Sequence, residues 1–324
     1  MALPFDGYEV DVGDRPAARA YGYDLEQALS SVVALEARIP EDAFTAASLG
    51  TERLGNGAVI GPGGLVLTIG YLIGEAEEIT LTTNEGRRVA AHALGSDAAT
   101  GFGLVQALEP LGLPALPLGS SRTLAAGDPV VIAGAGGRSH AAAGQVLARM
   151  PFAGYWEYLL DEAIITEPAH PHWSGAALLG AGGELVGVGS LSLQRHTKMG
   201  PRPINMFVPS ELLPPILDDL ARGRPAHPPR PWLGVLSQEI GRTVVVAGVS
   251  PGGPASRAEL RAGDRILAVG GEPVTSLADF YTRLWAQGPA GAVIPLRLQR
   301  EYDVFEVEVR SQDRGALMRK PRAH

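Results

Sequence analysis

The sequence of 324 residues contains no cysteine. This absence excludes disulfide bonds, thiolate metal sites and a cysteine nucleophile. Basic residues are also scarce, because 27 Lys and Arg stand against 35 Asp and Glu and give a formal net charge of −8. Such a balance provides no electrostatic footprint for nucleic acid or anionic lipid. We therefore expect no nucleic-acid partner, no metal site and no cofactor.

We also expect neither a targeting segment nor a membrane span. Residues 1–6 have neither a basic n-region nor an apolar core, so we expect no signal peptide here. On this ground we expect a cytoplasmic protein, or a periplasmic one if the natural chain begins further upstream. The uncharged stretch 54–74 has the length of a membrane span, but Pro62 and seven glycines break it.

What the sequence has in abundance is turn-forming residues, 42 Gly and 26 Pro. At this density they favour many short strands over long helices. From residue 55 to residue 208 short apolar runs alternate with Gly, Pro, Asn and Asp, a pattern typical of an antiparallel barrel or sandwich. The clearest expected strands are 58–60, 65–68, 78–82, 129–133 and 184–188.

Three helices and one linker are expected from capping signals and apolar spacing. Asp24 is a candidate cap for a helix through Leu25, Leu29, Val32 and Leu35. Ser210 is expected to cap a second helix, residues 212–221. Four prolines within 222–231 then mark a stiff linker between domains. Beyond it we expect a compact unit with a helix over 277–287, capped by Ser276, and two closing strands, 292–299 and 302–309.

Several motifs in order resemble the HtrA family of serine proteases. Residues 55–60 and 64–73 are similar to the family's G-S-G-x-I-I and G-x-I-L-T-N-x-H-V-V segments of the first barrel. Trp173-Ser174-Gly175 and residues 183–188 correspond to the second barrel, and residues 205–210 to its closing wall. Residues 248–255 and 262–274 are close to the pattern of bacterial PDZ domains.

The resemblance implies a mainly β protein, with a trypsin-like double antiparallel β-barrel followed by an α+β PDZ domain. The expected division is an N-terminal segment with one helix (1–49), a protease-like domain with a closing helix at 211–221 (50–222), a linker (223–231), the PDZ domain (232–311) and a tail (312–324).

The resemblance also aligns the catalytic positions. Ser174 falls on the nucleophile, whereas Tyr71 stands at the position of the histidine and Gly101 at that of the aspartate. His172 replaces the first glycine of the oxyanion loop, where a positive φ would strain it. A phenol with a pKa near 10 is a poor proton acceptor at neutral pH, so the triad is expected to be inactive. His92, His140, His170 and His172 are the histidines considered as substitute bases.

By the same resemblance, Trp232-Leu233-Gly234-Val235 is the loop that binds a peptide carboxylate, and an extended peptide would pair with the strand after it. Tyr281 and Trp285, on the expected helix, either line a ligand pocket or cover the core. The sequence thus predicts an inactive, protease-derived scaffold for protein C-termini or extended peptides. The alternatives are an active serine endopeptidase with a rearranged triad that uses Ser174, and a regulatory subunit of active relatives. A homo-oligomer, a trimer in this family, is implied by resemblance alone.

Overall fold

The structure is a computed structural model that describes residue 5 and residues 7–319. It divides into two compact units. The first contains the residues up to 150, residues 162–226 and those from 319 onward. The second contains residues 151–161 and 227–318. Within the described part of the chain, none of the helices has the length and apolarity needed to cross a membrane.

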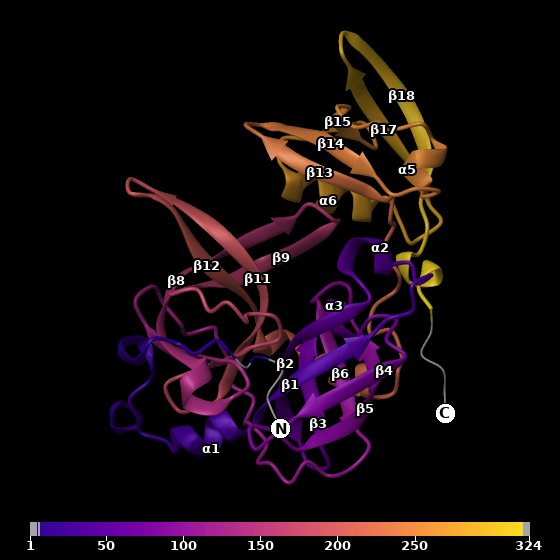
Figure 1. Ribbon diagram of the computed structural model, residues 1–324. Helices are drawn as coiled ribbons and strands as arrows, with labels where there is room; N and C mark the ends of the chain where they lie inside the picture. The colour runs from indigo at the N-terminus through magenta and orange to yellow at the C-terminus, as the bar shows by residue number, and fades with distance from the viewer. Residues whose placement is uncertain (1–4, 6, 320–324) are drawn as a thin grey trace. The chain divides into compact units, whose positions relative to one another are not determined.

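Two closed antiparallel barrels make up most of the first unit (Figure 1). Each barrel has six strands, and the five strands expected between residues 58 and 188 lie in these barrels, the last of them beginning at Leu185. The first barrel has the order β1-β2-β3-β6-β5-β4, and the second β10-β11-β12-β9-β8-β7. The strands are β1 (Val32–Arg38), β2 (Glu52–Gly61), β3 (Leu65–Ile69), β4 (Glu78–Thr82), β5 (Arg88–Ser96), β6 (Phe102–Ala107), β7 (Pro129–Ala133), β8 (Ala141–Gly154), β9 (Tyr158–Glu167), β10 (Ala177–Leu179), β11 (Leu185–Thr197) and β12 (Gly200–Pro209).

The first helix is shorter than its apolar spacing predicted. In α1 (Leu25–Ser30), Asp24 caps the helix by accepting a hydrogen bond of 3.0 Å from the Gln27 N–H. The expectation that the helix continues through Val32 and Leu35 is wrong, because these residues lie in β1, where Val32 pairs with Ala58. Val32 to Leu35 are all buried, as in a strand with both faces covered. The first barrel therefore begins well before residue 50.

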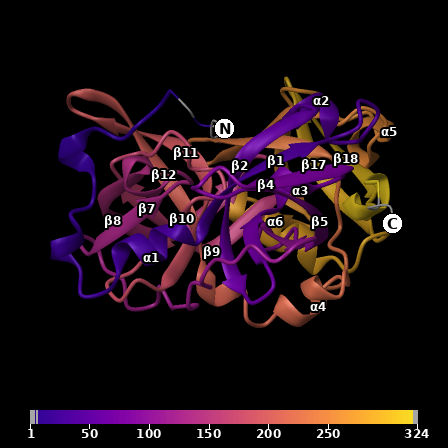
Figure 2. The ribbon, with the colours of Figure 1, turned by 60° about the horizontal axis from the view of Figure 1, so that its bottom comes forward.

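Short helices connect the strands of the first unit. In Figure 2, α1 lies beside the second barrel, where it packs against the 3-10 helix η3 (Gly137–His140). The expected closing helix over 211–221 is interrupted: Pro214 and Pro215 separate the 3-10 helix η4 (Ser210–Leu212) from α4 (Leu217–Ala221). Ser210 is not a side-chain cap, because its Oγ donates to the Gly119 carbonyl. The remaining short helices are η1 (Val12–Asp14), η2 (Ala18–Ala20), α2 (Ala46–Leu49) and α3 (Gly70–Ile73).

The second unit is a sheet covered by one amphipathic helix. The strand order is β13-β14-β15-β17-β18, with β16 paired to β15. Helix α6 (Leu277–Ala286) begins where it was predicted, because Ser276 Oγ accepts the Asp279 N–H at 3.0 Å. Its Phe280 and Leu284 are fully buried in the core. The other elements are β13 (Val235–Ile240), β14 (Thr243–Val249), α5 (Pro254–Arg257), β15 (Arg265–Val269), β16 (Glu272–Pro273), β17 (Val293–Arg300), β18 (Asp303–Arg310) and η5 (Arg314–Leu317).

One segment lies outside the domain to which its sequence position assigned it. Residues 151–161, which are the end of β8, a turn and the start of β9, group with the second unit. From their position in the sequence, these residues were expected inside the protease-like domain, 50–222. The physical reason is a set of hydrogen bonds from this hairpin tip to β13, α6 and the loop before β13, described below.

Candidate functional site

Ser174 lies on the loop between β9 and β10, and a buried asparagine of β2 holds this loop. The Asn56 side-chain amide donates to the carbonyls of His172 (2.8 Å) and Ser174 (3.0 Å), and its backbone N–H also donates to Ser174 O. Gly175 has φ +71°, and a Cβ there would lie 2.0 Å from Asn56 O. Only glycine fits this position, so the loop geometry is fixed by close backbone contact.

Tyr71, on α3, contacts the serine directly. Its phenol oxygen is 2.7 Å from Ser174 Oγ and donates to the Ser190 carbonyl at 2.9 Å. A phenol has one proton, so the Ser174 hydroxyl is the donor in the first of these hydrogen bonds. Desolvation by burial raises the pKa of Tyr71 to about 12, against a smaller lowering by its hydrogen bonds. Tyr71 is therefore a neutral phenol at neutral pH and not a general base.

The histidines of this loop hydrogen bond elsewhere. His170 Nδ1 accepts the backbone N–H of His172 at 3.1 Å, so its proton is on Nε2, which donates to the His140 carbonyl at 3.0 Å. Burial lowers the pKa of His170 to about 4, and it also lowers the pKa of His172. Within residues 5 and 7–319, no hydrogen bond joins a histidine ring to Ser174 Oγ.

The two remaining catalytic positions also differ from a working triad. The backbone N–H of His172, the residue expected in the oxyanion loop, points to His170 Nδ1. His172 does not have a positive φ, so the expected strain is absent. Gly101 has φ +85° and its carbonyl accepts the Gly70 N–H at 2.7 Å. Gly101 therefore forms a turn, without a carboxylate that would orient a base.

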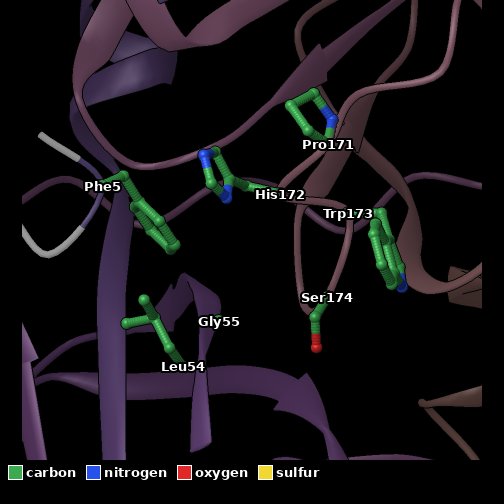
Figure 3. Close-up of a pocket in the computed structure, with 7 residues that line it drawn as sticks. All are labelled: Phe5, Leu54, Gly55, Pro171, His172, Trp173 and Ser174. Carbon is green, nitrogen blue, oxygen red and sulfur yellow. The ribbon is translucent and has the colours of Figure 1, made fainter. Parts of the chain in front are cut away.

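A small cavity of about 140 Å³ adjoins the serine. Figure 3 shows the His172 imidazole turned toward Phe5, away from the Ser174 hydroxyl. The ring centroids of Phe5 and His172 are 4.4 Å apart. An aromatic side chain from the start of the chain thus packs where it holds the imidazole away from the nucleophile. The lining residues are Phe5, Leu54, Gly55, Pro171, His172, Trp173 and Ser174.

In the second unit, the loop expected to bind a peptide carboxylate contacts a side-chain carboxylate of its own chain. The backbone N–H groups of Leu233, Gly234 and Val235 donate to Glu157 Oε1 at 3.2, 2.8 and 3.1 Å. Gly234 has φ +76°, which turns three consecutive N–H groups toward one point. Trp232 precedes them and pairs with Gln312 through two backbone hydrogen bonds of 3.0 Å.

Sequence reasoning missed both Glu157 and the role of Tyr281. The Tyr281 hydroxyl donates to the Gly154 carbonyl at 2.7 Å and accepts the Glu157 N–H at 3.2 Å. Its ring is buried and stacked on Trp285, so it both covers the core and contacts the hairpin. No local motif marks residues 154–157, and the only available signal was an unexplained aromatic cluster in 152–158.

Comparisons with known proteins place the two units in recognised domain types. A family described as trypsin-like peptidase domain matches residues 55–188, and a PDZ domain family matches residues 245–300. A probable periplasmic serine endoprotease, DegP-like, of Pseudomonas fluorescens is 28% identical over 80% of this chain. The serine endoprotease DegS of Escherichia coli is 27% identical over 80% of it. These alignments cover 56% of the DegP-like relative and 77% of DegS.

Solved structures agree with this assignment. The serine endoprotease from Yersinia pestis has a TM-score of 0.53 and 26% identity, covering 89% of this chain and 96% of its own. The HtrA-type protease AlgW with tripeptide has a TM-score of 0.53 and 22% identity, covering 92% and 97%, and supports the fold alone. The chain therefore combines a trypsin-like peptidase domain with a PDZ domain, and the expected mainly β fold is confirmed.

Proposed function

We propose that this protein is a peptide-binding scaffold that has lost serine-protease activity. The observation that carries the proposal is the hydrogen bond from the Ser174 hydroxyl to the Tyr71 phenol, at the position where catalysis needs an imidazole. Acyl transfer requires that the attacking hydroxyl give its proton to a base. A phenol whose pKa is raised to about 12 keeps its own proton at neutral pH and does not take another.

Two further features support the same proposal. The N–H of His172 is engaged with His170, so this donor is not directed at an oxyanion. Gly101 has no side chain with which to orient a base. In known proteases, removing the nucleophile or the base alone costs about 10⁶ in turnover, so these losses together predict no measurable hydrolysis.

Peptide binding is assigned to the second unit, since PDZ domains bind extended peptides by strand addition. Support comes from the convergence of three backbone N–H groups, those of residues 233–235, on one carboxylate oxygen. We propose protein C-termini with an apolar last residue as the ligands.

The second candidate is an active serine endopeptidase with a rearranged triad. It is favoured by the retained Ser174 and by the names of the relatives, which are called serine endoproteases. It requires a histidine to approach Ser174 after the loop that carries His170 and His172 rearranges. We further propose that the protein regulates active relatives, assembles as a trimer and is periplasmic, in line with the DegP-like relatives. Light scattering after size-exclusion chromatography tests the assembly.

Labelling with a fluorophosphonate probe separates the two candidates, because the probe reacts only with an activated serine. We expect no labelling and no hydrolysis of unfolded casein by the wild type, with Ser174→Ala indistinguishable from it. Ser190→Ala is the matched control, since it removes a neighbouring buried serine that is not at the nucleophile position. Labelling or casein hydrolysis that disappears in Ser174→Ala and persists in Ser190→Ala would overturn the proposal.

A further inference from the structure

The occupant of the carboxylate-binding loop is a segment of the same chain. Glu157 lies in the turn between β8 and β9, and its Oε1 accepts the N–H groups of Leu233, Gly234 and Val235. Oε2 is 3.1 Å from the Leu233 nitrogen. A side-chain carboxylate here makes the backbone contacts that a PDZ loop offers to a terminal carboxylate.

The backbone next to Glu157 follows the groove in the manner of a bound peptide. The Ser237 N–H of β13 donates to the Tyr155 carbonyl at 2.8 Å, which is a strand-addition contact on the edge of the sheet. On the opposite wall, the hydroxyl of Tyr281 in α6 bonds the Gly154 carbonyl and the Glu157 N–H. The hairpin tip is thus held from both β13 and α6 (Figure 1).

Apolar contacts extend the attachment beyond the polar groups. Ala153 and Leu159, on either side of the turn, pack against the hydrophobic core of the second unit. Tyr281 belongs to this core and is itself fully buried. The hairpin therefore contributes a carboxylate, a backbone strand contact and apolar side chains, the three elements with which peptides occupy such grooves.

Glu157 also has an unfavourable backbone conformation. Its φ is +62°, in the left-handed region that favours glycine or asparagine. This conformation raises the free energy of a glutamate, and the contacts of its side chain must offset that increase. Glu157 is therefore better suited to docking its carboxylate in the loop 233–235 than to forming the turn between β8 and β9.

We infer that residues 154–157 are an internal ligand of the PDZ groove. A C-terminal peptide then binds the loop 233–235 only when the Glu157 carboxylate has left it. This inference rests on the proposed peptide-binding function. When the open form of a site is a minor population, the observed affinity for an external ligand is the affinity of the open form multiplied by the open fraction. Removing the internal carboxylate should therefore strengthen the binding of an external peptide.

The charged and titratable groups that face Glu157 are consistent with this role. Desolvation raises its pKa to about 7, and the three backbone donors and the positive charge of Arg314 act in the opposite direction. Tyr281 is the other titratable group in contact, and burial raises its pKa, so it remains a neutral hydrogen-bonding phenol. A carboxyl at this site retains Oε1 as the acceptor for all three N–H groups when Oε2 is protonated.

The test compares Glu157→Ala with Glu157→Gln and with Asp161→Ala in the full chain. Asp161→Ala is the matched control, because it removes an exposed carboxylate from the same hairpin. The first readout is amide hydrogen exchange at Leu233, Gly234 and Val235. In Glu157→Ala we expect exchange at least about tenfold faster than in the wild type, because charge-assisted hydrogen bonds are lost. Glu157→Gln keeps the accepting oxygen and should preserve much of the protection.

The second readout is the affinity for a fluorescein-labelled decapeptide that ends in Val-Tyr-Phe with a free carboxylate, and for its C-terminal amide. We expect Glu157→Ala to bind the free acid about tenfold more tightly than the wild type and Asp161→Ala do. Equal exchange rates and equal affinities in Glu157→Ala and the wild type would overturn the internal-ligand inference. Faster exchange without binding of either peptide by any variant would keep that inference and contradict peptide binding by this groove.

Discussion

The loop of Ser174 and the loop of Leu233–Val235 are both surrounded by groups from their own chain, but with opposite chemical results. At the first, the Tyr71 phenol accepts the hydrogen bond of the nucleophile and offers no base. At the second, Glu157 supplies the carboxylate for which three backbone N–H groups are arranged. We propose that the first contact removes catalysis and that the second marks a site for carboxylate binding.

The difference follows from what each function requires. Proton transfer needs one side chain with a pKa matched to its task, so a single replacement such as Tyr71 for histidine abolishes it. Carboxylate binding needs backbone N–H groups, which every residue except proline provides, and a glycine that turns them. Drift in sequence thus removes the catalytic site far more readily than the binding loop.

The largest effect is expected from the scaffold of the serine loop. Gly175→Ala places a Cβ 2.0 Å from Asn56 O at a residue with φ +71°. We expect the free energy of unfolding, measured by urea denaturation, to fall by at least about 3 kcal/mol. Gly13→Ala, where a Cβ meets no atom within 4 Å, is the control and should be close to neutral. A neutral Gly175→Ala would show that the loop is not fixed by this contact.

The carboxylate loop is tested by Gly234→Val in a Glu157→Ala background. The residue has φ +76°, and a Cβ would lie 2.9 Å from the Trp232 ring, so the three N–H groups no longer converge. Binding of the free-acid decapeptide should weaken about a hundredfold, measured by fluorescence anisotropy. Gly241→Val, at a similarly positive φ but in open space, should leave the affinity unchanged. Equal affinities would remove the loop from the binding site.

Tyr71→Phe separates a structural phenol from a catalytic one. The change deprives Ser174 Oγ and the Ser190 carbonyl of a hydrogen-bond partner. We expect a loss of about 1–2 kcal/mol in the free energy of unfolding, with fluorophosphonate labelling absent before and after. Any hydrolytic activity that is present in the wild type and lost in Tyr71→Phe would mean that the phenol takes part in catalysis.

The smallest effect is a pH dependence of docking by Glu157. Its pKa is about 7 when docked and 4.5 ordinarily, so docking takes up a proton between these values. The small open fraction should therefore rise as the pH rises through this window and stay constant above it. The amide NMR signal of Gly234 reports that fraction. Glu157→Gln should show no such change, and an identical titration in that variant would refute the assignment to Glu157.

The strands, the helix cap at Ser276 and the order of the two domains were predictable because each depends on local spacing and turn chemistry. The predicted helix through Val32 and Leu35 was wrong because a buried strand and a helix face share short apolar runs. The prediction of one helix over 211–221 was wrong because Pro214 and Pro215 interrupt it.

The sequence by itself determined the order of the motifs, and from this order we predict which residues stand at the catalytic and carboxylate-binding positions. Only the tertiary structure decided what faces them: Tyr71 with Ser174, and Glu157 with the loop of Gly234. The partners are 103 and 77 positions apart in the chain. Contacts between such distant residues depend on how strands and hairpins pack, so local sequence patterns do not predict them.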